Sequence, residues 1–252
     1  MKVIINGELI EQEHSEVTSS GWRSGIGIFE TIKTVNGQPW AFSRHMRRAV
    51  TASLKEKIKM PAEENIRLAV SELIATEFHD RGVLRLSFDM SGNWAAAHIA
   101  YSEITSAAKV EIYPDVLINS GVPIKSYPYN HRLDILEKAK DRGFDEALVI
   151  NPDGNVCEGA VTNVLLKIAG KWSTPPLSDG VLPGVMRALV IENCDVGVRS
   201  ISVSEIQNIE AGFLLSSLRI AQPIASIDGR VLAQSHDFKA QIEAMALRTS
   251  VG

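Results

Sequence analysis

The chain has 252 residues, of which 45% are hydrophobic and 22% charged, as in an ordinary globular protein with ample core. Its net charge of −4 argues against a nucleic-acid-binding surface, and no apolar run is long enough to span a bilayer. The N-terminal segment predicts no signal peptide. The two cysteines, Cys157 and Cys194, show no metal spacing, so we expect free thiols and a cytoplasmic location.

The first half of the chain predicts short strands and two amphipathic helices. Ser43 is expected to cap a helix through about Lys55, with Met46, Ala49, Val50 and Leu54 along one side. A second helix follows Pro61, and its predicted apolar stripe is Ile66, Ala69, Val70, Leu73 and Ile74. The expected strands lie at 2–5, 8–10, 28–35, 39–42, 83–88, 98–103 and 109–113.

A cluster of Pro and Gly at 114–123 predicts a domain boundary. We expect a small N-terminal α/β domain at 1–114, a linker at 115–123 and a larger domain at 124–252. In the larger domain, helices are expected at 131–142, 184–194 and from about 237, with a short one from 204. Its expected strands lie at 146–150, 163–168, 171–174, 196–201 and 213–216. This mixture of strands and helices predicts two α/β or α+β domains.

Several common catalytic motifs are missing. The chain has no phosphate-binding G-x-x-x-x-G-K-[ST] loop, no G-x-G-x-x-G that opens a helix, and no G-x-S-x-G elbow. Its six histidines are scattered without paired ligand spacing, so the sequence predicts no metal site. Nucleotide-driven enzymes, metal hydrolases and serine hydrolases are therefore disfavoured.

Four other motifs occur in a fixed order. The first is G-I-G-I-F-E-T at 25–31, followed by N-G at 36–37 and H-M-R-R at 45–48. The second is Lys125, followed by G-F-D-E-A-L at 143–148. The third is V-C-E-G at 156–159 with Asn163, and the fourth is L-P-G-V-M-R at 182–187. Together they resemble the fold-type IV pyridoxal-phosphate (PLP) enzymes, which include branched-chain and D-amino-acid aminotransferases and 4-amino-4-deoxychorismate lyases.

The resemblance implies a D-amino-acid aminotransferase-like fold, in which the larger domain is a pseudo-barrel, and pyridoxal 5'-phosphate as the cofactor. It makes Lys125 the catalytic lysine, which forms a Schiff base with the cofactor aldehyde and moves a proton at the substrate carbon. Most lysines are simply solvated, but Lys125 follows the apolar run Val122-Pro123-Ile124, which favours burial and a lowered pKa.

The resemblance also assigns two charged residues to the cofactor. Glu158 matches the acid that keeps the pyridine nitrogen protonated, although a surface turn is its alternative interpretation. Arg48 matches the phosphate-binding arginine. The periodicity of its helix instead places Arg48 opposite the apolar stripe, facing solvent.

The remaining cofactor candidates have plain alternatives as well. Backbone N–H groups of Val185 and Met186, at the start of a helix, suit a phosphate, unless this is an ordinary loop–helix junction. Ser217 and Asn163 can add polar groups to the site. Tyr129, expected one helical turn beyond Lys125, can contact the ring hydroxyl or pack in the core.

Two reactions fit this cofactor site. The segment Ser216-Ser217-Leu218-Arg219 and the motif G-V-M-R resemble the lyase branch, which converts 4-amino-4-deoxychorismate into 4-aminobenzoate and pyruvate for folate biosynthesis. The alternative is an aminotransferase for branched-chain or D-amino acids with a 2-oxo acid. A non-catalytic PLP-binding or interaction protein is the third hypothesis. The substrate-binding candidates are Arg219, which is otherwise a surface arginine, and Phe29 and Arg85.

Some positions depart from the family pattern. Ile26 replaces the aspartate of the first motif, and Asp89-Met90-Ser91-Gly92 replaces the T-R-G that carries an arginine near the substrate. These departures concern the substrate more than the cofactor. The resemblance further implies a homodimer that acts on a small amino substrate, with neither a membrane nor a nucleic acid as partner.

Overall fold

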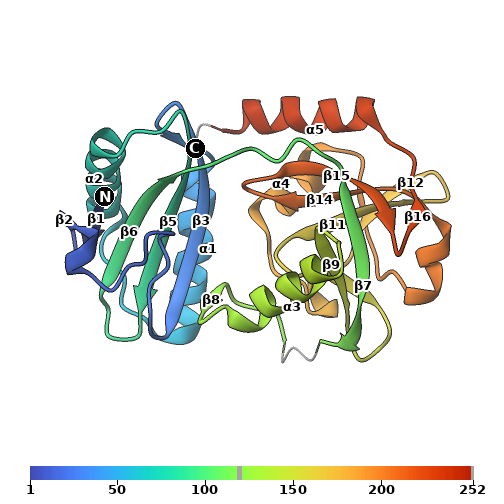
Figure 1. The fold of residues 1–252 in the computed structure, drawn as a ribbon, viewed down its shortest axis with the longest axis horizontal. Helices are drawn as coiled ribbons and strands as arrows, with labels where there is room; N and C mark the ends of the chain where they lie inside the picture. The colour runs from blue at the N-terminus through green and yellow to red at the C-terminus, as the bar shows by residue number, and fades with distance from the viewer. Residues whose placement is uncertain (118–120, 251–252) are drawn as a thin grey trace. The chain divides into compact units, whose positions relative to one another are not determined.

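The computed structural model describes residues 1–117 and 121–250. Its contacts divide the chain into two compact units, which are described separately (Figure 1). The first unit comprises Met1–Glu103, Ile124–Pro128 and the C-terminal residues from Thr249. The second comprises Ile104–Pro123 and Tyr129–Arg248.

An antiparallel sheet forms the centre of the first unit. Its strand order is β2-β1-β6-β5-β3-β4, and β8 also pairs with β3. The strands are β1 (Lys2–Ile5), β2 (Glu8–Glu11), β3 (Gly27–Val35), β4 (Gln38–Pro39), β5 (Arg81–Asp89), β6 (Trp94–Ala100) and β8 (Ser126–Tyr127). A short 3-10 helix, η1 (Gln12–His14), follows β2.

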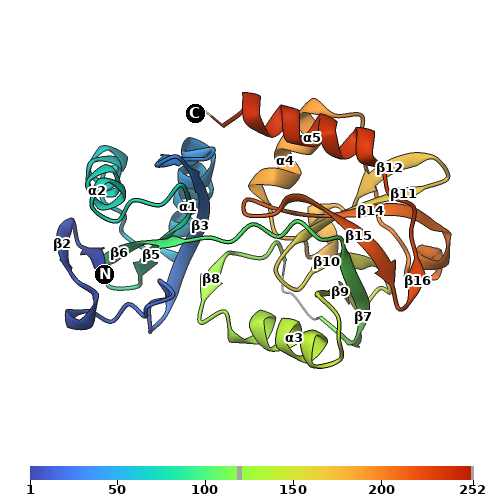
Figure 2. The ribbon, with the colours of Figure 1, turned by 45° about the horizontal axis from the view of Figure 1, so that its top comes forward.

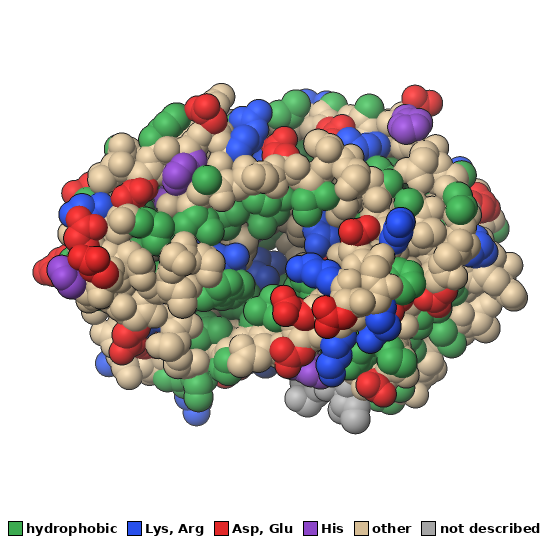
Figure 3. Space-filling view, viewed as in Figure 1, with side chains coloured by type: hydrophobic (Ala, Val, Ile, Leu, Met, Phe, Trp, Pro, Cys, Tyr) green, Lys and Arg blue, Asp and Glu red, His purple; other side chains and the backbone are tan. Residues whose placement is uncertain are grey.

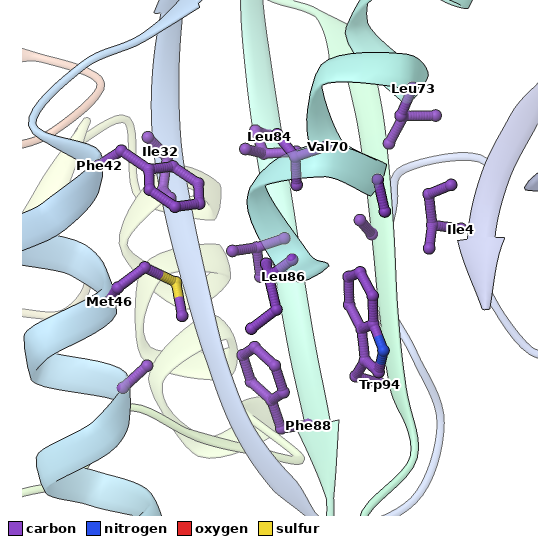
Figure 4. Close-up of a cluster of buried hydrophobic side chains, with 14 of the residues drawn as sticks. Ile4, Ile32, Phe42, Met46, Val70, Leu73, Leu84, Leu86, Phe88 and Trp94 are labelled. Carbon is purple, nitrogen blue, oxygen red and sulfur yellow. The ribbon is translucent and has the colours of Figure 1, made fainter. Parts of the chain in front are cut away.

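Two helices cover one face of this sheet, α1 (Phe42–Glu56) and α2 (Glu63–Thr76). Alternate residues of β3 and β5 point toward them, because successive side chains of a strand lie on opposite faces. Figure 4 shows the resulting core, which includes Ile4, Ile32, Phe42, Met46, Val70, Leu73, Leu84, Leu86, Phe88 and Trp94. The stripe predicted for α2 is confirmed, since all five of its residues are buried.

The other face of the sheet carries the intervening residues. The register pairs Phe29 with Ser87 and Thr31 with Arg85, so these four residues share that face. At the far end, Val17 packs on Val3, Ala95 and Ala97 in a small cluster. This second face is therefore more polar than the helix-covered one.

The second unit is built on a curled sheet in the order β10-β9-β7-β15-β14-β11-β12-β13, with β16 paired to β15. The strands are β7 (Ala108–Val116), β9 (Glu146–Ile150), β10 (Val156–Gly159), β11 (Asn163–Ile168), β12 (Lys171–Thr174), β13 (Gly197–Val198), β14 (Ile209–Ser216), β15 (Ile220–Ile227) and β16 (Arg230–Val231). Its core includes Val110, Leu148, Val164, Leu214 and Ile224, one from each of five strands.

Three helices pack on this sheet: α3 (Asn130–Asp141), α4 (Val185–Asn193) and α5 (His236–Arg248). Helix α3 contacts β7 and β9, whereas α4 contacts β14 and α5 contacts β15 (Figure 2). Two 3-10 helices, η2 (Leu177–Asp179) and η3 (Val203–Asn208), complete the unit. Both cysteines are free, as expected.

The predicted apolar side of α1 needs correction. Val50 is 41% exposed and Leu54 is 75% exposed, whereas His45 is buried and the Arg48 side chain is only 14% exposed. The reason is a buried acid on β3 that attracts these two polar residues to the sheet, which hydrophobic periodicity does not register. The predicted cap is also wrong, because Ala41 precedes the helix without a side-chain cap.

Several strand predictions shift for reasons of pairing. The strand expected at 98–103 begins at Trp94, because an alanine run pairs with both β1 and β5 and tertiary contacts override weak strand propensity. The strands expected at 39–42 and 196–201 shrink to two residues each. Strands β10 and β15 were not predicted. Pro223 lies within β15, and a proline argues against a strand because it has no backbone N–H to donate.

The expected domain division is corrected as well. Strand β7, expected in the N-terminal domain, pairs in parallel with β9 and β15 of the second unit, so the boundary precedes Ile104. Conversely, Ile124–Pro128 joins the first unit because β8 pairs with β3. Residues 118–120 of the expected linker lie outside the described residues.

Charged side chains of both signs are interspersed over the face visible in Figure 3, in keeping with the small net charge of −4. Within 1–117 and 121–250, no helix combines the length and apolar character needed to cross a bilayer.

Gly27 provides a test of how tightly β8 lies against the sheet. A Cβ atom at this position would lie 2.1 Å from the carbonyl oxygen of Phe88 and 2.7 Å from the phenol oxygen of Tyr127. We expect Gly27→Ala to lower the free energy of unfolding by about 1–3 kcal/mol, measured by urea unfolding, because both neighbours must move.

The matched control is Gly197→Ala in β13, where the nearest atom to a Cβ is Ser173 Oγ at 3.4 Å. This substitution should stay within about 0.5 kcal/mol of the wild type. Equal losses in the two variants would contradict the steric explanation.

Candidate active site

Lys125 is anchored to the sheet of the first unit. Ser126 and Tyr127 pair with Ile28 and Gly27, and the Phe29 N–H donates to the Lys125 carbonyl at 2.9 Å. The Lys125 Nζ lies 4.4 Å from the centre of the Phe29 ring, in cation–π contact. The amine is thus held on the polar face of the sheet and is not a freely solvated lysine.

Arg85 and Trp22 lie beside Phe29, the aromatic side chain that Lys125 contacts. The Trp22 ring meets Phe29 edge-on at 5.1 Å, and the Arg85 guanidinium stacks 3.9 Å from the centre of Trp22. Arg85 Nε donates to the Ser20 carbonyl at 3.0 Å, and Nη1 donates to the Thr31 hydroxyl at 3.3 Å. These acceptors are neutral groups.

Burial lowers the pKa of Arg85 to about 10, because the charged form loses solvation. Among the described residues, Arg85 forms no ion pair. A half-buried cation without an acid partner is only partly solvated, so this guanidinium suits an anionic ligand such as a carboxylate.

Arg48 is fixed by a buried acid, Glu30 on β3. Its Nε donates to Glu30 Oε1 at 2.8 Å and its Nη2 to Oε2 at 2.5 Å, while His45 Nδ1 lies 2.7 Å from Oε2. Burial alone would raise the pKa of Glu30, but the charge and hydrogen bonds of Arg48, with the contact to His45, lower it to about 2. Burial also lowers the pKa of His45. Glu30 therefore sets the orientation of the Arg48 guanidinium.

Glu158 is the centre of a hydrogen-bonded cluster in the second unit. Its Oε2 accepts from Asn163 Nδ2 at 2.9 Å and from the Leu182 N–H at 3.0 Å, and its Oε1 accepts from Arg132 Nη2 at 2.7 Å. The surface-turn alternative does not describe this residue, since Glu158 is buried in β10. Donors at both oxygens are the surroundings of an ionised carboxylate.

Helix α4 begins close to this cluster. Gly184 precedes the helix, no side chain caps it, and Val185 and Met186 are its first two residues. Backbone N–H groups of a first helical turn have no intrahelical acceptor and attract anions. A Cβ at Gly184 would lie 1.8 Å from Asn163 Oδ1, so only glycine lets the helix start this near the Glu158 partner.

Arg219, a predicted substrate residue, has an acid partner in the structure. It lies in the turn between β14 and β15, with Nη1 3.4 Å from Glu146 Oε2 and donating to the side-chain oxygen Oε1 of Gln222 at 3.1 Å. Glu146 also accepts from Thr162 Oγ1 and from the Ala160 N–H. Burial raises the pKa of Glu146, and Arg219 opposes that rise. The charge of Arg219 is thus partly neutralised by Glu146 within the second unit.

Other predicted residues are placed as follows. Asn163 positions Glu158 and also donates to the Leu182 carbonyl at 3.0 Å. Tyr129 directly precedes α3, and between Lys125 and Tyr129 lie strand β8 and a cis Tyr127–Pro128 peptide, so the expected helical spacing between them is wrong. Ser217 lies in the same turn as Arg219.

Sequence reasoning missed Glu30, Trp22 and Arg132. Glu30 stood within the first motif, so the motif carried a signal for it without indicating a role. Arg132 and Trp22 stand outside the quoted motifs, and only the contacts of the folded chain identify them.

The family model described as amino-transferase class IV matches residues 27–227, well over half of the chain. The chain belongs to the class IV aminotransferase family. D-alanine aminotransferase of Bacillus licheniformis is 24% identical, over 92% of this chain and 90% of its own length. Aminodeoxychorismate lyase of Bacillus subtilis is 26% identical, over 78% of this chain and 75% of its own length.

A solved branched-chain aminotransferase from Thermoproteus uzoniensis, crystallised with norvaline, superposes with a TM-score of 0.88. It is 23% identical, over 100% of this chain and 96% of its own length. At this identity the superposition shows that the two chains share a fold. The expected fold-type IV resemblance and mixed α/β fold are confirmed.

Class IV aminotransferases use pyridoxal 5'-phosphate, and the residues present fit this group. The first turn of α4 supplies free backbone donors for a phosphate beside the close approach of Gly184 and Asn163. Glu158 offers an oriented carboxylate to a ring nitrogen, and Lys125 offers an amine held on an aromatic face. Groups suited to the phosphate, to the ring nitrogen and to the aldehyde of the cofactor are thus present in the chain.

The buried Glu30 predicts a pH dependence. Its pKa of about 2 in the folded chain lies below its ordinary 4.5, so the unfolded chain binds the proton first as pH falls. The stabilisation, up to about 3 kcal/mol, is present above about pH 4.5 and is lost progressively toward pH 2. Urea unfolding should show a flatter pH dependence for Glu30→Gln over this range.

The control is Glu63→Gln, which breaks an exposed ion pair with Arg67 on α2. It should keep the wild-type pH dependence, because exposed pairs contribute little. A Glu30→Gln protein that loses stability with acid as steeply as the wild type would sink this assignment.

Proposed function

We propose that this chain is a PLP-dependent lyase that converts 4-amino-4-deoxychorismate into 4-aminobenzoate and pyruvate. The observation that carries the proposal is Arg85, a half-buried guanidinium for which the described residues offer no acid partner, on the same sheet face as Phe29. That face also holds Lys125 against the Phe29 ring. A substrate with an unsaturated ring and two carboxylates matches a site that offers aromatic rings as well as a cation, whereas a branched-chain amino acid has one carboxylate and no ring for the aromatic side chains.

We assign the cofactor roles to the residues that the resemblance implies. Lys125 acts as the amine that binds the cofactor and exchanges a proton at the substrate carbon, and Glu158 faces the ring nitrogen. Arg48, oriented by Glu30, and the N–H groups of Val185 and Met186 hold the phosphate. Asn163 keeps Glu158 in place, and Ser217 and Tyr129 complete the polar surroundings. When bound, PLP withdraws electrons from the substrate carbon that bears the amine.

The protein groups then have simple tasks in the reaction. Lys125 removes the ring proton of the substrate and returns a proton during release of the products. Arg85, and Arg219 to the extent that Glu146 leaves it available, hold the carboxylates, while Phe29 packs on the ring. The substrate has the summed atoms of 4-aminobenzoate and pyruvate, so the lyase reaction needs no acceptor, water or oxidant.

The deciding experiment supplies the purified, PLP-loaded protein with aminodeoxychorismate and no 2-oxo acid. Equimolar 4-aminobenzoate and pyruvate are expected, measured by fluorescence and by coupling to lactate dehydrogenase. Absence of both products, with steady amino transfer from D-alanine or a branched-chain amino acid to 2-oxoglutarate, would instead establish the aminotransferase alternative. The similarity to D-alanine aminotransferase supports that alternative.

Arg85 also predicts a change in substrate binding. Arg85→Leu should raise the KM for aminodeoxychorismate about 10- to 100-fold, because a charge-assisted hydrogen bond to a carboxylate is lost. Arg81→Leu, on the same strand but at an exposed position, is the control and should leave KM unchanged. An unchanged KM in Arg85→Leu would remove Arg85 from the substrate site.

Lys125 predicts a spectroscopic change. The wild type mixed with PLP should develop the visible absorbance of a lysine-bound cofactor, and Lys125→Ala should not. Turnover should fall about 10³-fold or more. Lys171→Ala, at an exposed strand start, should behave as the wild type. A wild type without this absorbance would favour the non-catalytic hypothesis.

The homodimer, which the family resemblance implies, and the cytoplasmic location, expected from the free thiols, stay predictions. Gel filtration of the active protein tests the first, and a fully active monomer would refute it.

A further inference from the structure

The ion pair between Arg132 and Glu158 has no role in the function proposed so far. Arg132 lies in the first turn of α3, and its Nη2 donates to Glu158 Oε1 at 2.7 Å. The two side chains are 11% and 5% exposed, so the pair is largely removed from solvent. At this depth a guanidinium has a strong effect on the neighbouring carboxylate.

The two oxygens of Glu158 are in different surroundings. Oε2 accepts the neutral N–H donors of Asn163 and Leu182, whereas Oε1 meets the charged guanidinium of Arg132. By comparison, Arg48 contacts both carboxylate oxygens of Glu30, with Nε donating to one and Nη2 donating to the other. Arg132 therefore supplies charge to Glu158 through one oxygen, while neutral donors position the other.

A second arginine adds to this field. Arg187 in α4 is buried, with Nη2 donating to the Pro175 carbonyl at 2.7 Å and Nε donating to the Thr174 hydroxyl at 3.2 Å. Burial lowers the pKa of Arg187, and the charge of Glu158 raises it, so the two groups interact electrostatically. Arg187 is held by neutral acceptors, so Arg132 is the arginine that contacts the acid directly.

We infer that Arg132 is a positioning residue whose charge makes Glu158 less able to stabilise a protonated ring nitrogen of the cofactor. This inference rests on the function proposed above. The physical reason is competition for one negative charge. A carboxylate shared with a guanidinium stabilises a neighbouring pyridinium less than an unshared carboxylate does. Arg132 thus limits how strongly the bound ring withdraws electrons from the substrate.

The test follows the ring nitrogen itself. Each protein is loaded with PLP that carries ¹⁵N in its ring, and the nitrogen chemical shift is titrated with pH. In Arg132→Met the titration midpoint should move up by about one pH unit relative to the wild type, because Glu158 no longer shares its charge. Arg132→Lys keeps the charge and should restore a midpoint near that of the wild type.

Arg142→Met is the matched control, since it removes an arginine that pairs with Glu111 at the opposite end of the same helix. It should leave the nitrogen midpoint unchanged. Thermal unfolding of all variants separates lost stability from the electrostatic effect. If Arg132 is only structural, Arg132→Met will unfold at lower temperature with an unmoved midpoint, and the inference fails.

Glu158→Gln separates this inference from the proposed function. A shifted midpoint in Glu158→Gln with no shift in Arg132→Met would overturn the role of Arg132 and leave the proposed position of Glu158 intact. No shift in Glu158→Gln would overturn both. A wild-type nitrogen that stays protonated to about pH 10 would also contradict the inference, because Arg132 would then not weaken the hold of Glu158.

Discussion

The pairing of β8 with β3 is the constraint on which the candidate site depends. Between Ile104 and Arg248 the chain belongs to the second unit except at Ile124–Pro128, and that short segment adds a strand to the sheet of the first unit. Tyr127 lies against Gly27, where a side chain would collide, and the Lys125 carbonyl accepts from the Phe29 N–H. Main-chain hydrogen bonds, rather than a flexible loop, therefore hold the lysine, and its amine has a fixed aromatic neighbour.

Four glutamates are buried among the described residues, and each has an arginine partner. Glu30 pairs with Arg48, Glu111 with Arg142, Glu146 with Arg219 and Glu158 with Arg132. An unpaired carboxylate at such depth costs several kcal/mol, so each partner is a requirement of burial before it is anything else. The pairs differ in geometry, however. Arg48 engages both oxygens of its acid, which favours a fixed orientation, whereas Arg132 engages one oxygen and leaves the other to neutral donors.

Local patterns predicted much of the fold. The stripe of α2, the alternation in β5 and the turn at Asn36-Gly37 follow from spacing and residue type, and all agree with the structure. Long-range contacts account for the failures. Arg48 is drawn toward the sheet by Glu30 on β3, and β7 belongs to the second unit because it pairs with β9 and β15. The motifs carried Lys125, Glu158 and Asn163. Arg132 stood outside the quoted motifs, and its partner is distant in sequence, so only the folded chain reveals it.

The different partners of Arg219 and Arg85 bear on which arginine is available to bind a substrate carboxylate. Arg219, which the lyase-like segment offers for a carboxylate, already faces Glu146, whereas the polar and aromatic partners of Arg85 within residues 1–117 and 121–250 are a carbonyl, a hydroxyl and the Trp22 ring. Arg85 lies on the same sheet as the segment that holds Lys125, two register pairs along from Phe29. The separation between the reactive amine and this cation is therefore set by strand pairing within one unit. An α-amino acid carries its amino group and carboxylate on one carbon, whereas aminodeoxychorismate carries them on different carbons, so a fixed separation distinguishes the two classes of substrate.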